Sequence, residues 1–146
     1  MLPVQRTIVP DVIRQQKLVT LTRNASVRQA ASLMAERGVG AVMVVEDLQL
    51  LGIFTERDVV KRVVAQGLDL DATRLNQVMT PDPDTLKPTD SVRNALDMMK
   101  MHGYRHLPVV QGKKLVGIVS IRDLYNTVMD QLEADILLLA EGLIHG

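Results

Sequence analysis

The chain repeats itself at a fixed interval of 65 residues. Residues 20–60 align without a gap on residues 85–125, and 15 of the 41 aligned pairs are identical. The matched stretches include Ser26-Val27-Arg28 on Ser91-Val92-Arg93 and Gly52-Ile53 on Gly117-Ile118. A fixed period of this kind indicates two copies of one supersecondary unit. We therefore expect approximate two-fold symmetry and two versions of any site that the unit carries.

The size and composition are typical of one compact globular domain. Each copy, of about 60 residues, would be only marginally stable alone, so the two are expected to share a core. Hydrophobic residues make up 47% of the 146 residues, with one Phe, two Tyr and no Trp. Lys plus Arg and Asp plus Glu both number 17. Because a nucleic-acid binder needs a basic surface or stacking aromatics, the composition argues against that class.

Cysteine is absent, which excludes disulfides, thiol catalysis and cysteine-ligated metals and agrees with the cytoplasmic location that we expect. Met1–Pro10 lacks the apolar run of a secretion signal. No stretch approaches the roughly 20 apolar residues that cross a bilayer, so we expect no membrane segment. The sequence also contains no P-loop and no readable histidine–carboxylate pair, and we expect no catalytic residue.

The hydrophobic pattern predicts an α+β fold in which each copy has the order β-α-β-β-α. Ser26 is the expected N-cap of the first helix, with Gln29 as its capping-box partner, and Gly38 is expected to end it. The first copy is expected to contain a strand at Lys17–Thr22, a helix at Val27–Arg37, strands at Ala41–Val45 and Leu50–Phe54, and a helix from Thr55. The second is expected to contain a strand at Asp84–Lys87, a helix from Val92 to Gly103, strands at Leu107–Val110 and Leu115–Val119, and a helix from Ser120.

We divide the chain into residues 1–75 for the first repeat with its N-terminal segment, 76–129 for the second repeat, and 130–146 for a C-terminal helical extension. Short helices are expected at Asn76–Met79 and Asp11–Arg14. The last helix is expected to run from Ile121 to Ile144. Its broad apolar face consists of Leu132, Ile136, Leu137, Leu139, Ala140 and Leu143. This face either packs on its own domain or pairs with a second chain.

The chemistry is concentrated in residues 52–58, Gly-Ile-Phe-Thr-Glu-Arg-Asp, and residues 117–123, Gly-Ile-Val-Ser-Ile-Arg-Asp. A hydroxyl followed three residues later by an acid is a capping box, and this structural explanation stays open. The functional explanation is that a hydroxyl at a helix N-terminus suits a phosphate, while the carboxylate accepts hydrogen bonds from two ribose hydroxyls. The glycine would let a backbone or a flat ligand approach closely. Arg57 and Arg122 either bind phosphate, neutralise the acids or are solvated.

With these motifs, the tandem order and residues 103–110, Gly-Tyr-Arg-His-Leu-Pro-Val-Val, the chain resembles a pair of cystathionine-β-synthase (CBS) domains, a Bateman module, over residues 11–128. The resemblance implies a pocket at the seam between the repeats for an adenosine-containing ligand such as AMP, ADP, ATP, NAD or S-adenosylmethionine. It places Asp58 and Asp123 on the ribose, with Thr55 and Ser120 beside them. Arg105 and His106 lie where such modules bind phosphate.

The full set of nucleotide-binding residues expected from the resemblance is Val19, Thr20, Val39, Ala41, Thr55, Arg57, Asp58, Asp84, Thr85, Tyr104, Arg105, His106, Pro108, Ser120, Arg122 and Asp123. The first repeat has Val39-Gly40-Ala41 where the second has Tyr104-Arg105-His106, and Met43 stands in place of Pro108. The first repeat therefore lacks the basic residues, and the two sites are not expected to be equivalent.

His102 and His106 are four residues apart, as in a helical metal site, but Gly103 should end the helix between them, so we expect no metal. His106 is then either a surface histidine or a phosphate neighbour. The expected function is a regulatory, energy-sensing module that signals to an unknown effector protein. The alternatives are an interaction protein with empty sites and an enzyme. The resemblance also implies a homodimer that associates through the second helices, Asp58–Ala65 and Asp123–Met129.

Overall fold

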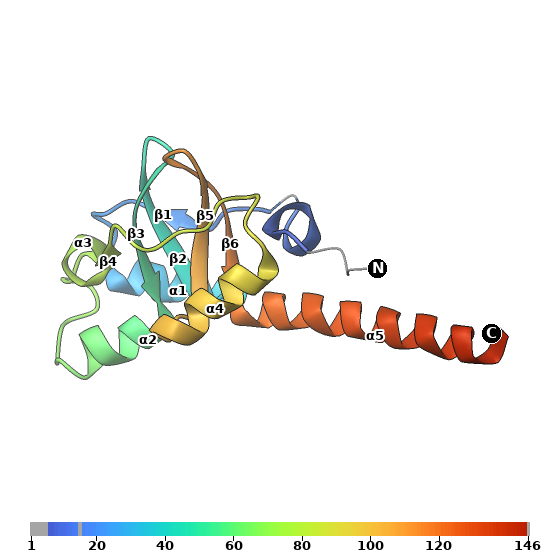
Figure 1. Cartoon of the computed structure of the whole chain (residues 1–146). Coiled ribbons are helices and arrows are strands. Elements are labelled where there is room, and N and C mark those ends of the chain that lie inside the picture. Colours follow the sequence, from blue (N-terminus) through green and yellow to red (C-terminus); the bar gives the residue numbers. More distant parts are fainter. Residues whose placement is uncertain (1–5, 15, 146) are drawn as a thin grey trace. The chain divides into compact units, whose positions relative to one another are not determined.

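The computed structural model describes residues 6–14 and 16–145, and the side chains of residues 6–14 and 16–142. The chain forms two compact units, and Figure 1 labels their helices and strands. We call the first the sheet unit, which consists of Gln15–Lys87 and Pro108–Ile118. The second, the helical unit, consists of Met1–Arg14, Pro88–Leu107 and Val119–Gly146.

The sheet unit contains most of the first repeat. Its elements are β1 (Thr20–Leu21), α1 (Val27–Arg37), β2 (Ala41–Glu46), β3 (Gln49–Thr55), α2 (Glu56–Asp58), the π-helix η2 (Val59–Val64), α3 (Leu75–Val78), β4 (Thr80–Pro81) and most of β5 (His106–Gln111) and β6 (Lys114–Ser120). The strands form one sheet in the order β1-β2-β3-β6-β5, with β4 paired to β3. The α+β fold class and the β2–β3 hairpin that we expected are therefore present.

The core of the sheet unit forms where α1 packs on the sheet. The stripe predicted from the helical period is confirmed for Val27, Ala30 and Met34, which are buried against Val42, Val44 and Phe54. The predicted stripe residues Ala31 and Leu33 are half-buried. Ser26 accepts from the Gln29 N–H at 3.1 Å and Gln29 Oε1 accepts from the Ser26 N–H at 2.8 Å, so the predicted capping box is formed. Gly38 ends α1 in the left-handed conformation with φ 64°, which favours glycine.

The helical unit contains the π-helix η1 (Ile8–Val12), α4 (Val92–His102), α5 (Ile121–His145) and the ends of β5 and β6. Both η1 and α4 pack against α5. The Ile8 N–H donates to the Asp90 carbonyl at 2.9 Å, and the Val92 N–H donates to the Arg6 carbonyl at 2.9 Å. The N-terminal segment thereby covers the start of α4.

Residues 73–75 bond the start of α1 through the main chain, as residues 6–8 bond the start of α4. The Leu75 N–H donates to the Ala25 carbonyl at 2.9 Å, and the Val27 N–H donates to the Thr73 carbonyl at 3.0 Å. The short helices that we expected at Asn76–Met79 and Asp11–Arg14 therefore begin earlier, at Leu75 and Ile8. Both of these side chains are fully buried, and their burial fixes where each segment enters the fold.

The repeat is visible in the hydrogen bonding as well as in the sequence. Leu21 pairs with Val44 in the parallel β1–β2 ladder, and 65 residues later Leu86 pairs with Val109 in an isolated parallel bridge. A complete strand at Asp84–Lys87 was therefore a wrong prediction. The segment makes this one bridge, and its Lys87 is followed by Pro88, which has no N–H to extend a ladder.

The second helix of the first repeat also differs from the expectation. It begins as α2 and continues as a π-helix, with the Ala65 N–H bonded to the Val60 carbonyl at 2.9 Å. The wider turn places Val63 in the core and leaves Val60 and Val64 exposed.

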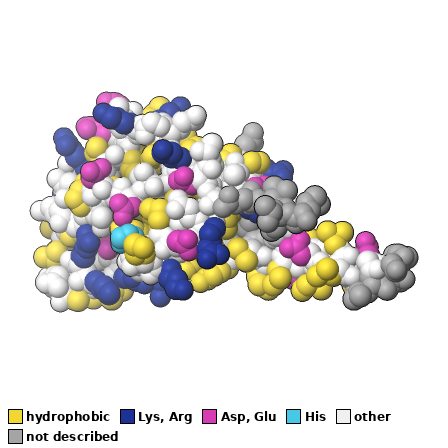
Figure 2. Space-filling model, in the orientation of Figure 1, with side chains coloured by type: hydrophobic (Ala, Val, Ile, Leu, Met, Phe, Trp, Pro, Cys, Tyr) yellow, Lys and Arg dark blue, Asp and Glu magenta, His cyan; other side chains and the backbone are white. Residues whose placement is uncertain are grey.

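The α5 helix is 25 residues long. Its apolar residues between residues 132 and 142 are exposed in this chain, including Ile136 at 54% and Leu139 at 69%. The alternative in which this face packs on its own domain is therefore wrong for residues 132–142. The side chain of Leu143 lies outside the described residues. Figure 2 shows hydrophobic side chains gathered along this part of α5. None of the helices in residues 6–14 and 16–145 combines the length and apolar character that a membrane span requires.

Candidate functional site

The first motif lies where β3 ends and α2 begins, in the sheet unit. The Thr55 main-chain N–H donates to Asp58 Oδ2 at 3.0 Å, and the Asp58 N–H donates to Thr55 Oγ1 at 3.2 Å. These two bonds form the reciprocal capping box that the sequence pattern allowed. It occupies one lone pair of one carboxylate oxygen and leaves Oδ1 for another partner.

The second motif lies where β6 ends and α5 begins, in the helical unit. The Ser120 N–H donates to Asp123 Oδ2 at 3.0 Å, and the Asp123 N–H donates to Ser120 Oγ at 3.1 Å. The two motifs therefore have the same capping geometry. The second stands at the N-terminus of a long helix, whose dipole and free N–H groups favour an anion.

The remaining carboxylate oxygen of Asp58 has a cationic neighbour. Arg62 Nε lies 3.4 Å from Asp58 Oδ1, and the Asp58 side chain is 15% exposed. Arg62 also donates from Nη1 to the Val78 carbonyl at 3.0 Å. We did not predict either contact, although the spacing of an acid and an arginine four residues apart on a helix would have indicated the ion pair.

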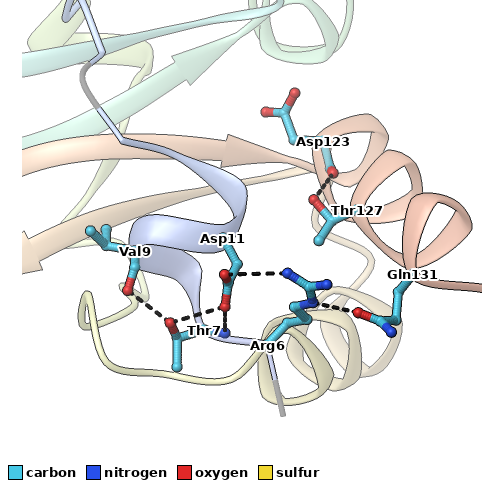
Figure 3. Close-up of polar contacts among 7 residues, drawn as sticks. All are labelled: Arg6, Thr7, Val9, Asp11, Asp123, Thr127 and Gln131. Carbon is cyan, nitrogen blue, oxygen red and sulfur yellow. Dashed lines mark hydrogen bonds and ion pairs between the residues drawn. The ribbon is translucent and has the colours of Figure 1, made fainter. Parts of the chain in front are cut away.

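The corresponding position in the second repeat is Thr127. Its hydroxyl donates to the Asp123 main-chain carbonyl at 3.0 Å rather than to the carboxylate. In Figure 3 the Asp123 carboxylate points away from the network of Arg6, Asp11 and Gln131. Within the described residues, no ion pair is formed by Asp123.

The basic residues expected on the phosphate lie beside the second motif. The Ile121 N–H donates to the Arg105 carbonyl at 2.9 Å, so Arg105 stands at the first turn of α5. Its side chain is exposed, while Tyr104 and His106 are half-buried. The Tyr104 ring stacks on His102, with ring centroids 5.2 Å apart. Arg122 and, in the sheet unit, Arg57 are exposed.

His102 ends α4 and His106 begins β5, so the two histidines come from different elements, as expected. In the part of the chain that the structure describes, no group of three or more His, Asp or Glu side chains is arranged to hold a metal ion.

The other residues expected to bind the nucleotide lie in the sheet unit. Ala41 pairs with Thr55 across the β2–β3 hairpin, and the Val19 carbonyl accepts from the Met43 N–H at 3.1 Å. The Pro108 carbonyl accepts from the Leu86 N–H at 2.8 Å. Their exposures differ: Ala41 and Pro108 are buried, Val19, Thr20, Val39 and Thr85 are half-buried, and Asp84 is exposed. The sheet unit therefore brings Ala41 directly beside the first motif.

Close packing explains why a glycine stands at position 52 in the first motif. A Cβ at Gly52 would lie 2.8 Å from the Thr80 carbonyl oxygen and 2.5 Å from Met79 Sδ. Gly52 pairs with Pro81 in the β3–β4 ladder. Of the two partners that we expected for this glycine, a backbone or a flat ligand, the structure places the backbone of β4 there.

Two shallow depressions of the sheet unit lie beside α1 and β1 rather than at the motif. The first is lined by residues that include Arg28, Asp71 and Arg74, and the second by residues that include Thr20. Arg28 forms an ion pair with Asp71 at 2.5 Å, and the hydrogen bond to Asp71 raises the pKa of Arg28. Thr20, in the second depression, is the expected site residue among those that line them.

Comparison with known proteins identifies the family. The model of the CBS domain matches residues 9–65 and 75–130, so the chain belongs to the CBS domain family and contains a tandem pair. It is 39% identical over 116 residues to the CBS domain-containing protein YhcV of Bacillus subtilis, a match that covers 80% of this chain and 81% of that protein.

Solved structures agree with this assignment. A protein with CBS domains from Burkholderia ambifaria is 37% identical, with a TM-score of 0.80 over 85% of this chain and 94% of that one. A CBS domain protein from Pyrobaculum aerophilum, solved in complex with AMP, is 32% identical, with a TM-score of 0.71 over 77% of this chain and 87% of that one.

Proposed function

We propose that this chain is a non-catalytic regulatory module that binds an adenosine-containing nucleotide and signals its level to a separate protein. The observation that carries the proposal is the pair of Thr/Ser–Asp caps with identical geometry, in a family one of whose members is solved with AMP. The ligand class is AMP, ADP, ATP or NAD, and the cytoplasmic location expected from the sequence belongs to the same proposal.

The chemistry of the second motif suits such a ligand. The Asp123 carboxylate has acceptor capacity beyond the Ser120 N–H, and two adjacent ribose hydroxyls are donors at the right spacing for one carboxylate. The positive end of the α5 dipole attracts phosphate. Arg105, at the same helix end, supplies a guanidinium that can bind phosphate through two parallel hydrogen bonds.

A thermal-shift screen tests the proposal. The purified chain is heated with AMP, ADP, ATP, NAD and S-adenosylmethionine in turn, and with inorganic phosphate and adenosine as controls. A nucleotide at about 100 times its dissociation constant adds roughly 2.7 kcal/mol to the free energy of unfolding, a shift of several degrees. The double variant Asp58→Asn/Asp123→Asn should lose that shift. If none of the nucleotides raises the unfolding temperature of the native chain at millimolar concentration, the proposal is wrong.

The exposed face of α5 favours a second function, an interaction protein with no physiological nucleotide. Leu132, Ile136 and Leu139 give this helix an exposed apolar surface, and a protein partner could bind it whether or not a nucleotide is present. The screen above separates the two functions, because an interaction protein would show no nucleotide-dependent stabilisation.

We also propose that the chain forms a homodimer through its second helices. Val60 and Val64 of η2 are exposed, as are Tyr125 and Met129 of α5. Exposed apolar side chains gathered on one helix are typical of interaction surfaces, and closed two-fold pairing is the commonest way to bury them.

A further inference from the structure

The two motifs have the same capping hydrogen bonds but differ one helical turn further on. In the first repeat the residue four positions after the acid is Arg62, and in the second repeat it is Thr127. Arg62 forms an ion pair with Asp58, whereas Thr127 bonds the Asp123 main chain. This difference changes what each carboxylate can accept.

Both oxygens of Asp58 are engaged. Oδ2 accepts from the Thr55 N–H, and Oδ1 faces Arg62 Nε at 3.4 Å. Ion pairs at full exposure contribute little, but here the Asp58 side chain is 15% exposed and the Arg62 side chain 45% exposed, so solvent screens the carboxylate of this pair less than that of a fully exposed pair. Arg62 is also fixed from the other side by the Val78 carbonyl. A ribose that approached Asp58 would have to displace or share a guanidinium that is held at two points.

The Asp123 carboxylate has no such competitor. Oδ2 accepts a hydrogen bond from the Ser120 N–H, and within the described residues no cation forms an ion pair with this carboxylate. The cation drawn in Figure 3, Arg6, is turned to Asp11 and Gln131. The second carboxylate therefore accepts hydroxyl donors without first breaking an ion pair.

We infer that Arg62 closes the first motif to a ribose and that the high-affinity nucleotide site of this chain is the second motif. The inference rests on the proposed function, and it assigns Arg62 as the residue that sets the order in which the two motifs are occupied. Arg62 acts by holding Asp58 and does not itself contact the nucleotide.

The first experiment is titration calorimetry with AMP on the native chain, Asp58→Asn and Asp123→Asn. The native chain should bind one AMP at high affinity. Asp123→Asn should weaken that binding about 10- to 100-fold, since a charge-assisted hydrogen-bonded contact is lost, and Asp58→Asn should change it less than about twofold. Two equivalent sites, each removed by its own variant, would overturn the inference and leave the proposed function standing. Absence of AMP binding in the native chain would overturn both.

The second experiment exchanges the two residues. Arg62→Thr should open the first motif and raise its AMP affinity by about fivefold or more, which appears as a second binding event. Asp58→Asn added to that variant should remove the event. Arg62→Lys, which keeps the charge, should stay closer to the native chain. Thermal unfolding identifies any variant that has lost its fold, and Thr127→Arg then provides the reciprocal test through weaker binding at Asp123. Unchanged stoichiometry in a folded Arg62→Thr chain, or weaker AMP binding because Arg62 contacts phosphate, would contradict the inference.

Discussion

The main-chain N–H of Ile121 donates to the carbonyl oxygen of Arg105 at 2.9 Å, and this bond fixes the start of β5 to the first turn of α5. The equivalent bond occurs 65 residues earlier, where the main-chain N–H of Glu56 donates to the Gly40 carbonyl at 3.0 Å. The repeat therefore preserves the backbone at this point and changes the side chains: Arg105 stands where the first copy has Gly40, and Ile121 where it has Glu56. The two motifs thus differ in charge at equivalent positions.

Arg105→Ala should weaken ATP binding more than adenosine binding. The guanidinium can bind phosphate oxygens in a bidentate manner, and adenosine has none. We expect a loss of about 10-fold for ATP, corresponding to one charge-assisted contact, and less than about twofold for adenosine. Calorimetry measures both affinities, and Arg93→Ala, which removes another exposed arginine of the helical unit, is the matched control. Equal losses for the two ligands would mean that Arg105 does not contact phosphate.

Gly52→Ala should destabilise the chain because its Cβ would collide with the Thr80 carbonyl and with Met79. Met79 can shift, but the backbone of β4 is paired at this point, so we expect a cost of about 1–3 kcal/mol in the free energy of unfolding. Gly142→Ala is the control. It lies in α5 with nothing within 4 Å of the added Cβ, and it should be neutral or stabilising. Urea denaturation compares the two variants, and a Gly52→Ala chain as stable as Gly142→Ala would contradict the close approach.

The sequence predicted the local features of the fold better than the contacts between distant segments. The Ser26 capping box, the Gly38 helix end and the Ala41–Thr55 hairpin depend on residues near one another in the chain, and each was predicted. The β4 segment on Gly52 depends on a residue 29 positions away, at Pro81, and no local pattern indicates it. The Thr/Ser–Asp motifs follow from the sequence, whereas the hydrogen bond from Arg62 to the Val78 carbonyl depends on how the chain folds back and no local pattern indicates it.

The N-terminal segment should loosen in acid. The pKa of Asp11 is lowered from 3.8, chiefly because its carboxylate accepts the Thr7 N–H, with Arg6 nearby. A group whose pKa is lower in the folded chain stabilises it above the unfolded value, and this contribution is lost as the pH falls through the folded value. Stability should therefore fall below about pH 4 in part through Asp11, and Asp11→Asn should flatten that part of the profile. Thermal unfolding between pH 2 and pH 6 checks this expectation. Parallel profiles for the two chains would show that Asp11 does not contribute.

Light scattering at micromolar concentration should give twice the chain mass of 16.2 kDa, because the exposed faces of η2 and α5 pair with a second copy. Ile136→Glu should shift the population toward the single chain, since it places a charge on the apolar face of α5. Met101→Glu, at an exposed apolar residue of α4, should leave the mass unchanged. A native chain that scatters as a single copy, with and without AMP, would contradict the pairing.

A crystal structure of the chain grown with AMP tests the central claim most directly, because it locates the ribose. We expect the two ribose hydroxyls to lie about 2.6–3.0 Å from the oxygens of Asp123, with Ser120 beside the nucleotide and Asp58 still paired with Arg62. AMP held by other residues, with Asp123 engaged only in its cap, would contradict it.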